Sequence, residues 1–358
     1  MKTFRRSSRL IVAAVAASLV LSACGGSDDE SGVQKAETGA LPTTVPAGTQ
    51  LTFGDYPNNT ELLMKESGYG AKLKSDVEYA VFPGQLPEVI EAVRAGKVDI
   101  AWNGDVGTVL ARAQGVGVIG VGAVTGGYPP SGLFVSEKNR DVKTVADLKG
   151  KRVAIPGATS SGLTVLSALA AGGLKPTDVE LVNLSIPDVP AALRSNDIDA
   201  GILFEPNKTK LAVELKGTGF HELTDIKDYA PEGQVLYVSQ KALADPAKAA
   251  AIRDYVYNWV QAVLWRKDHL HEFSIAQNVK ANGFDEATSQ IIEDTTRDHL
   301  YTFKVDDIDD QLVARLQKYI DMFVGVGYLE KGTTAKGSMD FRFDEVQKQA
   351  VKDYEAQQ

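Results

Sequence analysis

The first half of the chain alternates short apolar stretches with longer segments in which apolar residues recur every three or four positions. Residues 77–82 alternate apolar with polar or small side chains, as strands do. Residues 87–95 carry apolar residues at helical spacing between Pro87 and Gly96, the usual start and stop residues of a helix. The pattern predicts strands at 51–54, 77–82, 98–102 and 116–124, and helices at 60–67, 87–95 and 106–114. This order favours an α/β lobe around a mostly parallel sheet.

A second series of the same kind follows. It predicts helices at 144–148, 163–171 and 189–194, and strands at 152–155, 179–184 and 200–204. Apolar stretches at 132–136 and 235–239 flank this series, and we expect them to be two strands that carry the chain out of the first lobe and back. Residues 246–324 are mainly helical, and the apolar stripe within 252–263 indicates core packing. The polar stretch 341–358 is predicted to be peripheral.

The N-terminus has the pattern of an export signal that ends in a lipid-attachment site. Positive residues precede an apolar run at 10–20, which is too short to span a membrane permanently. The run ends at Leu21-Ser22-Ala23-Cys24, which resembles the lipobox of bacterial lipoproteins. The resemblance implies cleavage before Cys24 and a diacylglycerol on its sulfur. Residues 25–48 have almost nothing to bury, so we expect a flexible tether and a folded body that begins near Thr49.

Composition and charge narrow the class of protein further. The formal net charge is −9 over 358 residues, which argues against an extended nucleic-acid surface, and removal of the positive signal would make it more negative. Cys24 is the single cysteine, so its lipidation leaves no thiol for a disulfide, a thiolate metal site or a nucleophile. No later stretch approaches about eighteen consecutive apolar residues, the length needed to span a bilayer. The length favours two lobes over one.

Three loops share one construction, in which a strand is followed by small polar residues and then by the start of a helix. They are residues 57–60, 103–105 and 157–162. The exposed N–H groups and the positive dipole end of a helix start favour an anion. In open α/β sheets such loops lie at the carboxyl ends of strands, where ligands bind. Each loop alone is also explained by ordinary helix capping, because Ser, Thr, Asn and Asp are the usual N-cap residues.

Enzyme interpretations of the same residues are weaker. Ser160 is not in a Gly-x-Ser-x-Gly elbow, because Ala158 occupies the required glycine position. His269 and His271 are two positions apart on a predicted helix, so they point to different faces and do not share a metal. Asp105 and Glu205 are the acids that an acid–base pair would use. We expect no catalytic residue, no metal and no cofactor.

Two runs of residues resemble the sulfonate, taurine and nitrate solute-binding proteins of ABC importers. The first comprises Phe82-Pro83-Gly84-Gln85, residues 91–100 and Gly104-Asp105. The second follows the family's order through residues 145–154, with Asp147-Leu148-Lys149-Gly150-Lys151, then through 157–162, 197–201 and Phe204-Glu205-Pro206. The resemblance covers residues 49–328. The Asp-Leu-Lys-Gly-Lys segment identifies the superfamily, but its role there is structural and it names no ligand.

The resemblance implies ligand contacts at the positions that match the family's ligand loops. Two departures leave the ligand class open, because Val106-Gly107 stand where members often have a proline, and Phe204 stands where they often have tryptophan. Tyr128 precedes the crossover and would supply an aromatic wall. The implied contact residues are Pro57, Asn58, Asn59, Gln85, Gly104, Asp105, Thr125, Tyr128, Thr159, Ser160, Ser161 and Glu205.

The expected fold is α/β, a two-lobed type II periplasmic-binding-protein fold with two crossover strands. The expected parts are a signal peptide at 1–23, a lipidated tether at 24–48, lobe one at 49–134 and 236–330, lobe two at 135–235, and a peripheral C-terminal segment at 331–358.

The function implied is capture of a small organic anion, such as an aliphatic sulfonate or a taurine-like compound, between the lobes of a lipid-anchored extracytoplasmic monomer. The partners implied are an ABC permease and its ATPase, and the membrane through the N-terminal lipid, with no nucleic acid. Nitrate, a carboxylate or a thiamine-precursor pyrimidine are the alternative ligands. Alternatives of another class are an exported serine-dependent hydrolase that uses Ser160 and a sensor that presents its ligand to a membrane receptor.

Overall fold

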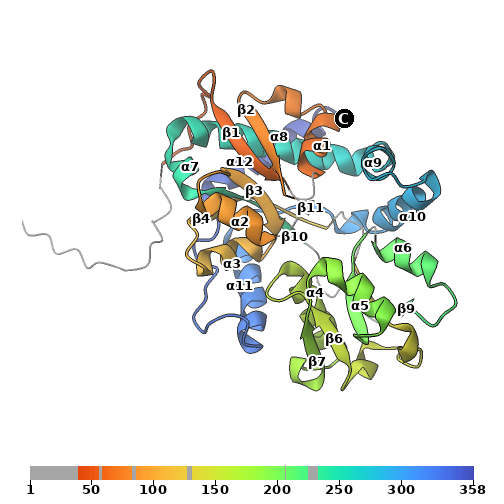
Figure 1. Ribbon diagram of the computed structural model, residues 1–358. Coiled ribbons are helices and arrows are strands. Elements are labelled where there is room, and N and C mark those ends of the chain that lie inside the picture. The colour runs from red at the N-terminus through yellow and green to blue at the C-terminus, as the bar shows by residue number, and fades with distance from the viewer. Residues whose placement is uncertain (1–38, 56–58, 83–85, 127–130, 206, 225–232) are drawn as a thin grey trace, which may run out of the picture. The chain divides into compact units, whose positions relative to one another are not determined.

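The computed structural model describes residues 39–55, 59–82, 86–126, 131–205, 207–224 and 233–358, and within them the chain forms two β-sheets surrounded by helices (Figure 1). Sheet A comprises β1 (Gln50–Asp55), β2 (Asp76–Val81), β3 (Ile100–Gly104), β4 (Val118–Thr125), β10 (Gly233–Ser239) and β11 (Lys304–Val305). Sheet B comprises β5 (Gly132–Val135), β6 (Arg152–Ile155), β7 (Glu180–Asn183), β8 (Ala200–Leu203) and β9 (His221–Glu222). The fold is therefore α/β with two lobes, as the alternation in the sequence predicts.

The helices include the five that apolar periodicity predicts at 60–67, 87–95, 106–114, 163–171 and 189–194. The helices of the described residues are α1 (Asn59–Glu66), α2 (Leu86–Arg94), α3 (Gly107–Ala113), α4 (Ser160–Ala171), α5 (Val189–Ser195), α6 (Asn207–Glu214), α7 (Gln240–Ala244), α8 (Pro246–Asp268), α9 (Leu270–Ser274), α10 (Glu286–Arg297), α11 (Asp310–Gly325) and α12 (Asp344–Glu355). Residues 144–148 form a 3₁₀ turn, η3 (Val145–Leu148), and a π-helical segment, η6 (Ile275–Ala281), follows α9. After α2, Gly96 has a φ of 70°, which ends the helix as the sequence predicts. Among the described residues, no helix is both long and apolar enough to cross a membrane.

Sheet A has the strand order β11-β4-β10-β3-β1-β2. Strand β1 pairs in parallel with β2 and β3, whereas β10 runs antiparallel to both β3 and β4. The register places Gly233 beside Thr125, Gln234 beside Gly104, and Lys304 beside Thr125. One edge of sheet A therefore gathers the ends of β3, β4, β10 and β11, which belong to distant parts of the sequence.

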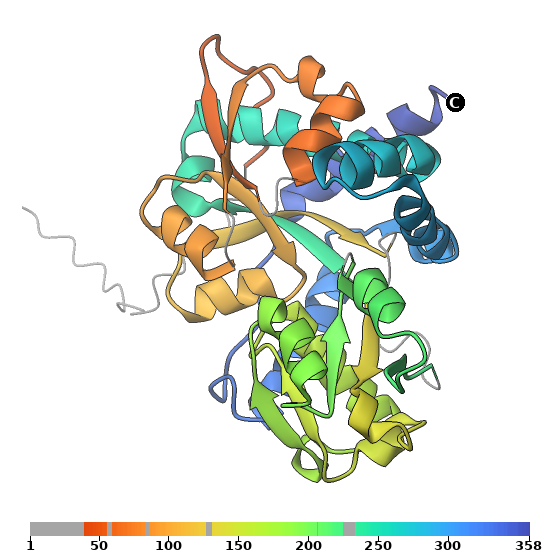
Figure 2. The same cartoon turned by 45° about the vertical axis from the view of Figure 1, so that its right-hand side comes forward.

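Sheet B has the order β7-β6-β8-β5-β9. Strands β6, β7 and β8 are parallel, and β5 runs antiparallel to β8 and β9. Each flanking strand belongs wholly to one sheet, since β5 pairs only within sheet B and β10 only within sheet A. Sheet B is built from strands between Gly132 and Glu222, and sheet A is built from strands before and after that stretch (Figure 2).

The C-terminal segment is not peripheral, and this corrects the prediction for 331–358. Helix α12 packs along α8, and it buries Val346, Ala350 and Tyr354, whose spacing of four residues places them on one face (Figure 1). Gln347 is also buried, accepts a hydrogen bond from the N–H of Ala123 (2.8 Å) and donates to the carbonyl of Asp306 (2.7 Å). The polar composition of this segment conceals an apolar stripe only one residue wide.

The part of the expected tether that the structure describes also lies on the folded body. Leu41 and Val45 pack against the core, and Arg342 donates a hydrogen bond to the carbonyl of Gly39 (3.3 Å). Two separated apolar residues in a polar stretch are too weak a pattern to predict this contact. Cys24 lies outside the described residues.

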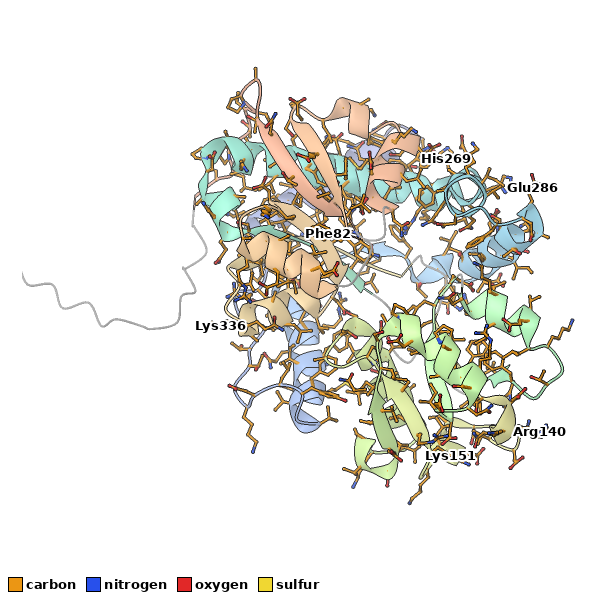
Figure 3. The ribbon with its side chains drawn as sticks, viewed as in Figure 1. Phe82, Arg140, Lys151, His269, Glu286 and Lys336 are labelled. Carbon is orange, nitrogen blue, oxygen red and sulfur yellow. The ribbon has the colours of Figure 1, made fainter. Side chains whose placement is uncertain are left out.

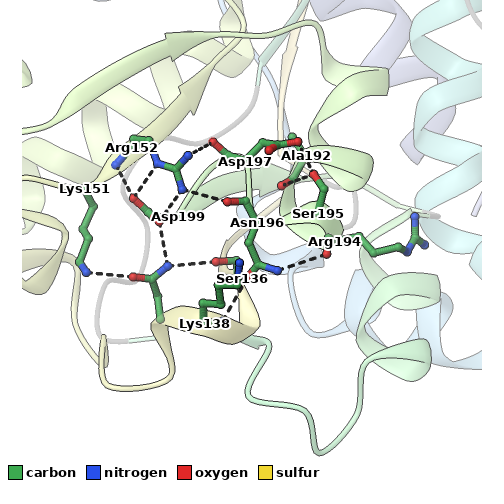
Figure 4. A network of polar contacts seen from close by, with 11 residues as sticks. Ser136, Lys138, Lys151, Arg152, Ala192, Arg194, Ser195, Asn196, Asp197 and Asp199 are labelled. Atoms are coloured by element: carbon green, nitrogen blue, oxygen red, sulfur yellow. Dashed lines mark hydrogen bonds and ion pairs between the residues drawn. The ribbon is translucent and has the colours of Figure 1, made fainter.

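The superfamily segment of the second lobe has a structural role, as expected. Arg152 pairs with Asp199 (3.1 Å) and donates to the carbonyl of Asn196 (2.9 Å), while Asn139 links Asp199 to Lys151 (Figure 4). In the preceding turn Thr144 and Asp147 form a capping box. This network lies at the amino ends of β6 and β8, so it is at the opposite end of those strands from Ser160 and Glu205. Lys151 and Arg140 lie together at that far end of sheet B in Figure 3.

Candidate functional site

The three predicted loops all follow the carboxyl ends of parallel strands. Asn59 begins α1 after β1, Gly104 ends β3 with Asp105 directly after it, and Ser160 begins α4 after β6. The structure brings two of these loops together, because the Ser160 hydroxyl of sheet B's lobe donates a hydrogen bond to Oδ1 of Asp105 (3.2 Å) in sheet A's lobe. The candidate site therefore lies where the carboxyl ends of the two sheets face each other.

The start of α4 has the geometry of an anion-binding helix end. Thr159 is the N-cap, and its hydroxyl accepts from the N–H of Gly162 (3.1 Å) and donates to the carbonyl of Pro156 (2.9 Å). None of the described residues accepts from the N–H groups of Ser160 or Ser161. These two donors and the dipole of a 12-residue helix point out of the same end.

Glycine is required at position 162 for this loop to close. A Cβ at Gly162 would lie 2.0 Å from the carbonyl oxygen of Gly157, so a side chain there would push the loop away from the helix. Gly157 itself has a φ of 58°, in the left-handed region that favours glycine. The sequence from Gly157 to Gly162 is therefore explained by the shape of the turn that presents Ser160 and Ser161.

The carboxylate of Asp105 is buried and held firmly on its own lobe. Its side chain accepts from the N–H of Val106 (3.0 Å), and its own N–H donates to the carbonyl of Gly233 (3.1 Å). Only 4% of the residue is exposed. A carboxylate accepts hydrogen bonds and does not donate them, so the proton in the contact with Ser160 comes from the serine.

The structure adds an arginine that the sequence analysis did not identify. Arg315 of α11 makes a two-pronged ion pair with Asp306 (2.9 and 3.1 Å) and donates to the hydroxyl of Thr125 (3.3 Å). Thr125, one of the predicted contact residues, donates to Asp306 (2.6 Å). Helix α11 packs against α4, so the guanidinium lies on the side of sheet A that faces the other lobe. No sequence signal separated this arginine from the surface arginines of other helices.

The charges of this group influence one another. Burial by itself would lower the pKa of the Arg315 guanidinium, but Asp306, Tyr319 and Asp105 together raise it above its usual value. Burial raises the pKa of the Tyr319 hydroxyl, and the negative charge of Asp105 adds to the rise. Asp105, Arg315 and Tyr319 therefore form one electrostatic neighbourhood, with the start of α4 facing it through Ser160.

The start of α1 is less suited to a ligand anion than the sequence predicts. The buried carboxylate of Asp55 accepts from the N–H groups of Thr60 (3.1 Å) and Glu61 (2.9 Å). The protein's own anion thus occupies this helix start. The side-chain oxygen of Asn59 accepts from Gln277 (2.8 Å).

Glu205 lies at the carboxyl end of β8, where it contacts the beginning of α6. One carboxylate oxygen accepts from the N–H of Thr209 (3.2 Å), and the other is buried with no hydrogen-bond partner among the described residues. Burial raises the pKa of the nearby Glu222 carboxyl, Lys208 opposes that rise and Glu205 adds to it. The structure thus places Glu205 at the same end of sheet B as Ser160 but in a separate polar group.

Several predicted residues do not enter this geometry. Pro57, Asn58, Gln85 and Tyr128 lie outside the described residues. His269 directly follows α8 and stacks on Trp265 (Figure 3). His271 contacts Glu293 (2.7 Å). In the described ranges no group of three or more His, Cys, Asp or Glu side chains could hold a metal ion.

Comparison with known proteins gives a family match and several relatives. A family model described as NMT1/THI5 like matches residues 62–263. Two proteins of Escherichia coli (strain K12) are similar over part of their lengths. One, named as an aliphatic sulfonates-binding protein, is 34% identical over 133 residues, 37% of this chain and 41% of that protein. The other, the taurine-binding periplasmic protein, is 32% identical over 167 residues, 47% of this chain and 49% of that protein.

An enzyme is also among the relatives. The 4-amino-5-hydroxymethyl-2-methylpyrimidine phosphate synthase of Legionella pneumophila (strain Philadelphia 1) is 30% identical over 156 residues, 43% of this chain and 48% of the enzyme. The chain thus spans about half or less of the length of these three relatives.

A solved structure extends the likeness of the fold over most of the chain. The alkanesulfonate-binding protein SsuA from Xanthomonas axonopodis pv. citri, bound to MOPS, superposes with a TM-score of 0.66 at 21% identity. The superposition covers 82% of this chain and 97% of that one. The two proteins therefore have a similar two-lobed fold.

Proposed function

The chain belongs to the NMT1/THI5-like family, and from that premise we propose that it is the extracytoplasmic solute-binding component of an ABC importer. The partners are then a permease and its ATPase, and the protein acts as a monomer that carries one small molecule between its lobes. The relatives named for binding aliphatic sulfonates and taurine support this class of function.

The observation that carries the proposal is the start of α4. Two N–H groups, on Ser160 and Ser161, have no acceptor among the described residues, and the hydroxyl of Ser160 contacts Asp105 of the other lobe. A sulfonate spreads one negative charge over three acceptor oxygens, so backbone N–H groups and a helix dipole can hold it. The ligand class we propose is a small sulfonate, such as an alkylsulfonate or taurine.

Arg315 would supply a positive charge to the bound anion. Its hydrogen bonds to Asp306 and Thr125 use three of the five donors of a guanidinium, and they fix its plane. Its net charge offsets that of Asp306, while Lys304 also contacts Asp306 (3.2 Å). An anion near Asp105 thus finds positive charge on α11 as well as at the helix start.

An exported serine hydrolase fits the geometry less well. A nucleophilic serine needs a base that takes its proton, commonly a histidine. Ser160 instead donates to a carboxylate, and His221, His269, His271 and His299 all have hydrogen-bond partners elsewhere. We infer a binding role without catalysis, with a thiamine-precursor pyrimidine as the second candidate ligand because of the synthase among the relatives.

Calorimetric titration of the full chain tests the proposal. The panel is an alkylsulfonate, taurine, nitrate, a carboxylate and hydroxymethylpyrimidine. A true ligand present at a hundredfold excess over its dissociation constant should also add about 2.7 kcal/mol to the free energy of unfolding. Saturable binding of a sulfonate supports the assignment, whereas binding of the pyrimidine alone would replace the proposed ligand class, and turnover of an ester substrate would replace the class of function.

We expect Arg315→Gln to weaken sulfonate binding by about 1–3 kcal/mol, the cost of losing a hydrogen bond to a charged group. Arg315→Lys should give an intermediate loss, since it keeps the charge but loses the planar fork. Lys318→Gln is the matched control, because it removes the same charge from an exposed position on the same helix. Equal affinity in Arg315→Gln and Lys318→Gln would exclude Arg315 from the site.

A further inference from the structure

The lobes touch each other through Gly104, Asp105 and Ser160. The hydroxyl of Ser160 donates to Asp105 (3.2 Å), and the same hydroxyl lies directly over Gly104. A Cβ at Gly104 would lie 2.0 Å from Oγ and 2.4 Å from Cβ of Ser160, so only glycine permits this approach. Gly104 lies in a strand and has no positive φ, so its backbone conformation does not require glycine. Glycine at position 104 is therefore explained by the close approach of Ser160 from the other lobe.

Both ends of this contact are fixed on their own lobes. Asp105 is held by Val106 and by the carbonyl of Gly233 on β10, the neighbouring strand of sheet A. Ser160 is the first residue of α4, behind the Thr159 cap, and its carbonyl accepts from the hydroxyl of Thr164 (3.0 Å). A hydrogen bond between two rigid elements reports the separation of the lobes, because neither side chain can follow the other if the lobes part.

Other contacts between the lobes accompany this one, since α11 packs against α4 and α6 packs against α10. The ammonium of Lys210 on α6 lies over the ring of Phe284, 4.4 Å from its centroid. Helix α6 follows the last parallel strand of sheet B, and Phe284 precedes α10. The approach of the lobes therefore does not depend on the Ser160 contact alone.

A sulfonate and the Asp105 carboxylate would need the same hydroxyl proton. Ser160 has one O–H, and in this contact that proton points at Asp105. An anion bound at the start of α4 would also lie near the negative charge of Asp105, which disfavours it. The ligand and the contact between the lobes are therefore alternatives for Ser160.

We propose that Asp105 and Ser160, packed over Gly104, form a latch that holds the lobes together and that the ligand must displace. Displacement of the latch by a ligand rests on the proposed binding function, whereas the latch itself is a property of the protein alone. It makes Asp105 a negative regulator of affinity and Gly104 the residue that allows the latch to close.

The test measures the distance between the lobes by double electron–electron resonance, with no ligand added. The full chain carries Cys24→Ser, with spin labels at Lys97→Cys on lobe one and Lys149→Cys on lobe two, both exposed positions. Gly104→Ala should reduce the short-distance population about five-fold or more, the lower end of the effect of overpacking one methyl group. Gly325→Ala is the matched control, because a Cβ there meets nothing within 4 Å.

A second variant separates the latch from misfolding. Ser160→Ala keeps the Cβ over Gly104 and adds no atom, but it removes the hydroxyl that donates to Asp105, so it should also reduce the short-distance population. Far-ultraviolet circular dichroism must be the same for all variants. An unchanged distance distribution in either Gly104→Ala or Ser160→Ala would overturn the latch.

The ligand side of the proposal is tested with methanesulfonate and taurine. Asp105→Asn should tighten binding of methanesulfonate about three- to ten-fold, because a neutral amide is a weaker competitor for the serine proton and carries no charge. Weaker binding in Asp105→Asn would show that the carboxylate serves the ligand and does not compete with it. If no sulfonate binds the parent protein, the proposed function fails, while the distance measurements still decide whether the latch exists.

Discussion

At the scale of single residues, Asp306 is the carboxylate that ties three parts of lobe one together beside the candidate site. It contacts Thr125 of β4, Arg315 of α11 and Lys304 of β11. Its side chain is 2% exposed. Burial alone would raise the pKa of this carboxyl, but the hydrogen bonds of Arg315 and Thr125 hold it below its usual value. The edge of sheet A thus depends on an ionised, buried acid.

Asp306→Asn should lower the free energy of unfolding by about 1–3 kcal/mol, because it leaves the Arg315 guanidinium without its partner. The sign with pH follows from linkage: a carboxyl whose folded pKa is depressed stabilises the fold above its unfolded pKa of about 3.9 and loses that stabilisation as the pH falls through the folded value. Urea unfolding between pH 6 and pH 3 should therefore show a shallower loss on acidification in the variant. The exposed Asp307→Asn is the control, and an equal pH slope in both variants would contradict this account.

Glu205 offers a test of how the ligand is oriented. If it faces the far end of the ligand, Glu205→Gln should weaken taurine, which carries an amine, more than a plain alkylsulfonate, by about 1–2 kcal/mol in calorimetry. Glutamine still offers an oxygen to the N–H of Thr209, so the start of α6 should survive. Equal losses for both ligands would mean that Glu205 only caps this helix.

At the scale of elements, α12 connects several parts of lobe one. Its face packs along α8, and the hydroxyl of Tyr354 donates to Asp268 at the end of that helix (2.9 Å). Gln347 on the same helix joins β4 to the segment before α11. The last helix therefore supports the strands that carry Thr125 and Asp306.

Tyr354→Ala should destabilise the protein by about 3–5 kcal/mol, the range found when a large buried ring is removed from a core. The tyrosine is 4% exposed, whereas its neighbour Glu355 is exposed, so Glu355→Ala is the matched control. Chemical unfolding measures both. A change within about 0.5 kcal/mol in Tyr354→Ala would restore the peripheral interpretation of this segment.

The elements that sequence predicted and those that it missed differ in a physical way. Strand β6 is a short apolar run between Gly150 and Pro156, and helix α2 has apolar residues at helical spacing before Gly96, so local pattern is sufficient for both. Strands β9 and β11 have two residues each and exist only because a neighbouring edge accepts them. The loops at Gly104 and Ser160 were predicted from their composition, but Arg315 entered the site through tertiary packing, which no spacing in the sequence records.

At the scale of the whole molecule, the sequence predicts a body held to a membrane by its first residue after cleavage. Lobe one is built from two separate stretches of the chain and lobe two from one, so two covalent connections join them. Such an arrangement suits a hinge, since few links must bend when the lobes close. A lipid on Cys24 would leave this hinge unaffected, because the attachment point precedes both lobes.

Cys24→Ser should leave the protein unprocessed at that site or release it from the membrane fraction, and it should abolish labelling with a palmitate analogue, because serine cannot form the thioether. Ligand affinity in the released protein should match that of the parent. Substitution of Ser27 by alanine, three positions away, is the control that leaves the attachment residue intact. Membrane retention and labelling in Cys24→Ser would show that the N-terminal resemblance is misleading.

The order of the strands also has a consequence for the time at which each lobe can form. All strands of sheet B lie between Gly132 and Glu222, so that sheet can pair as soon as this one stretch has left the ribosome. Sheet A begins at Gln50 but awaits β11 near residue 305, and its support by α12 awaits residue 344. Contacts so distant in sequence form slowly, so the first lobe to be synthesised is the last to be finished. A nascent chain would carry a paired second lobe and an open first one until synthesis is nearly complete.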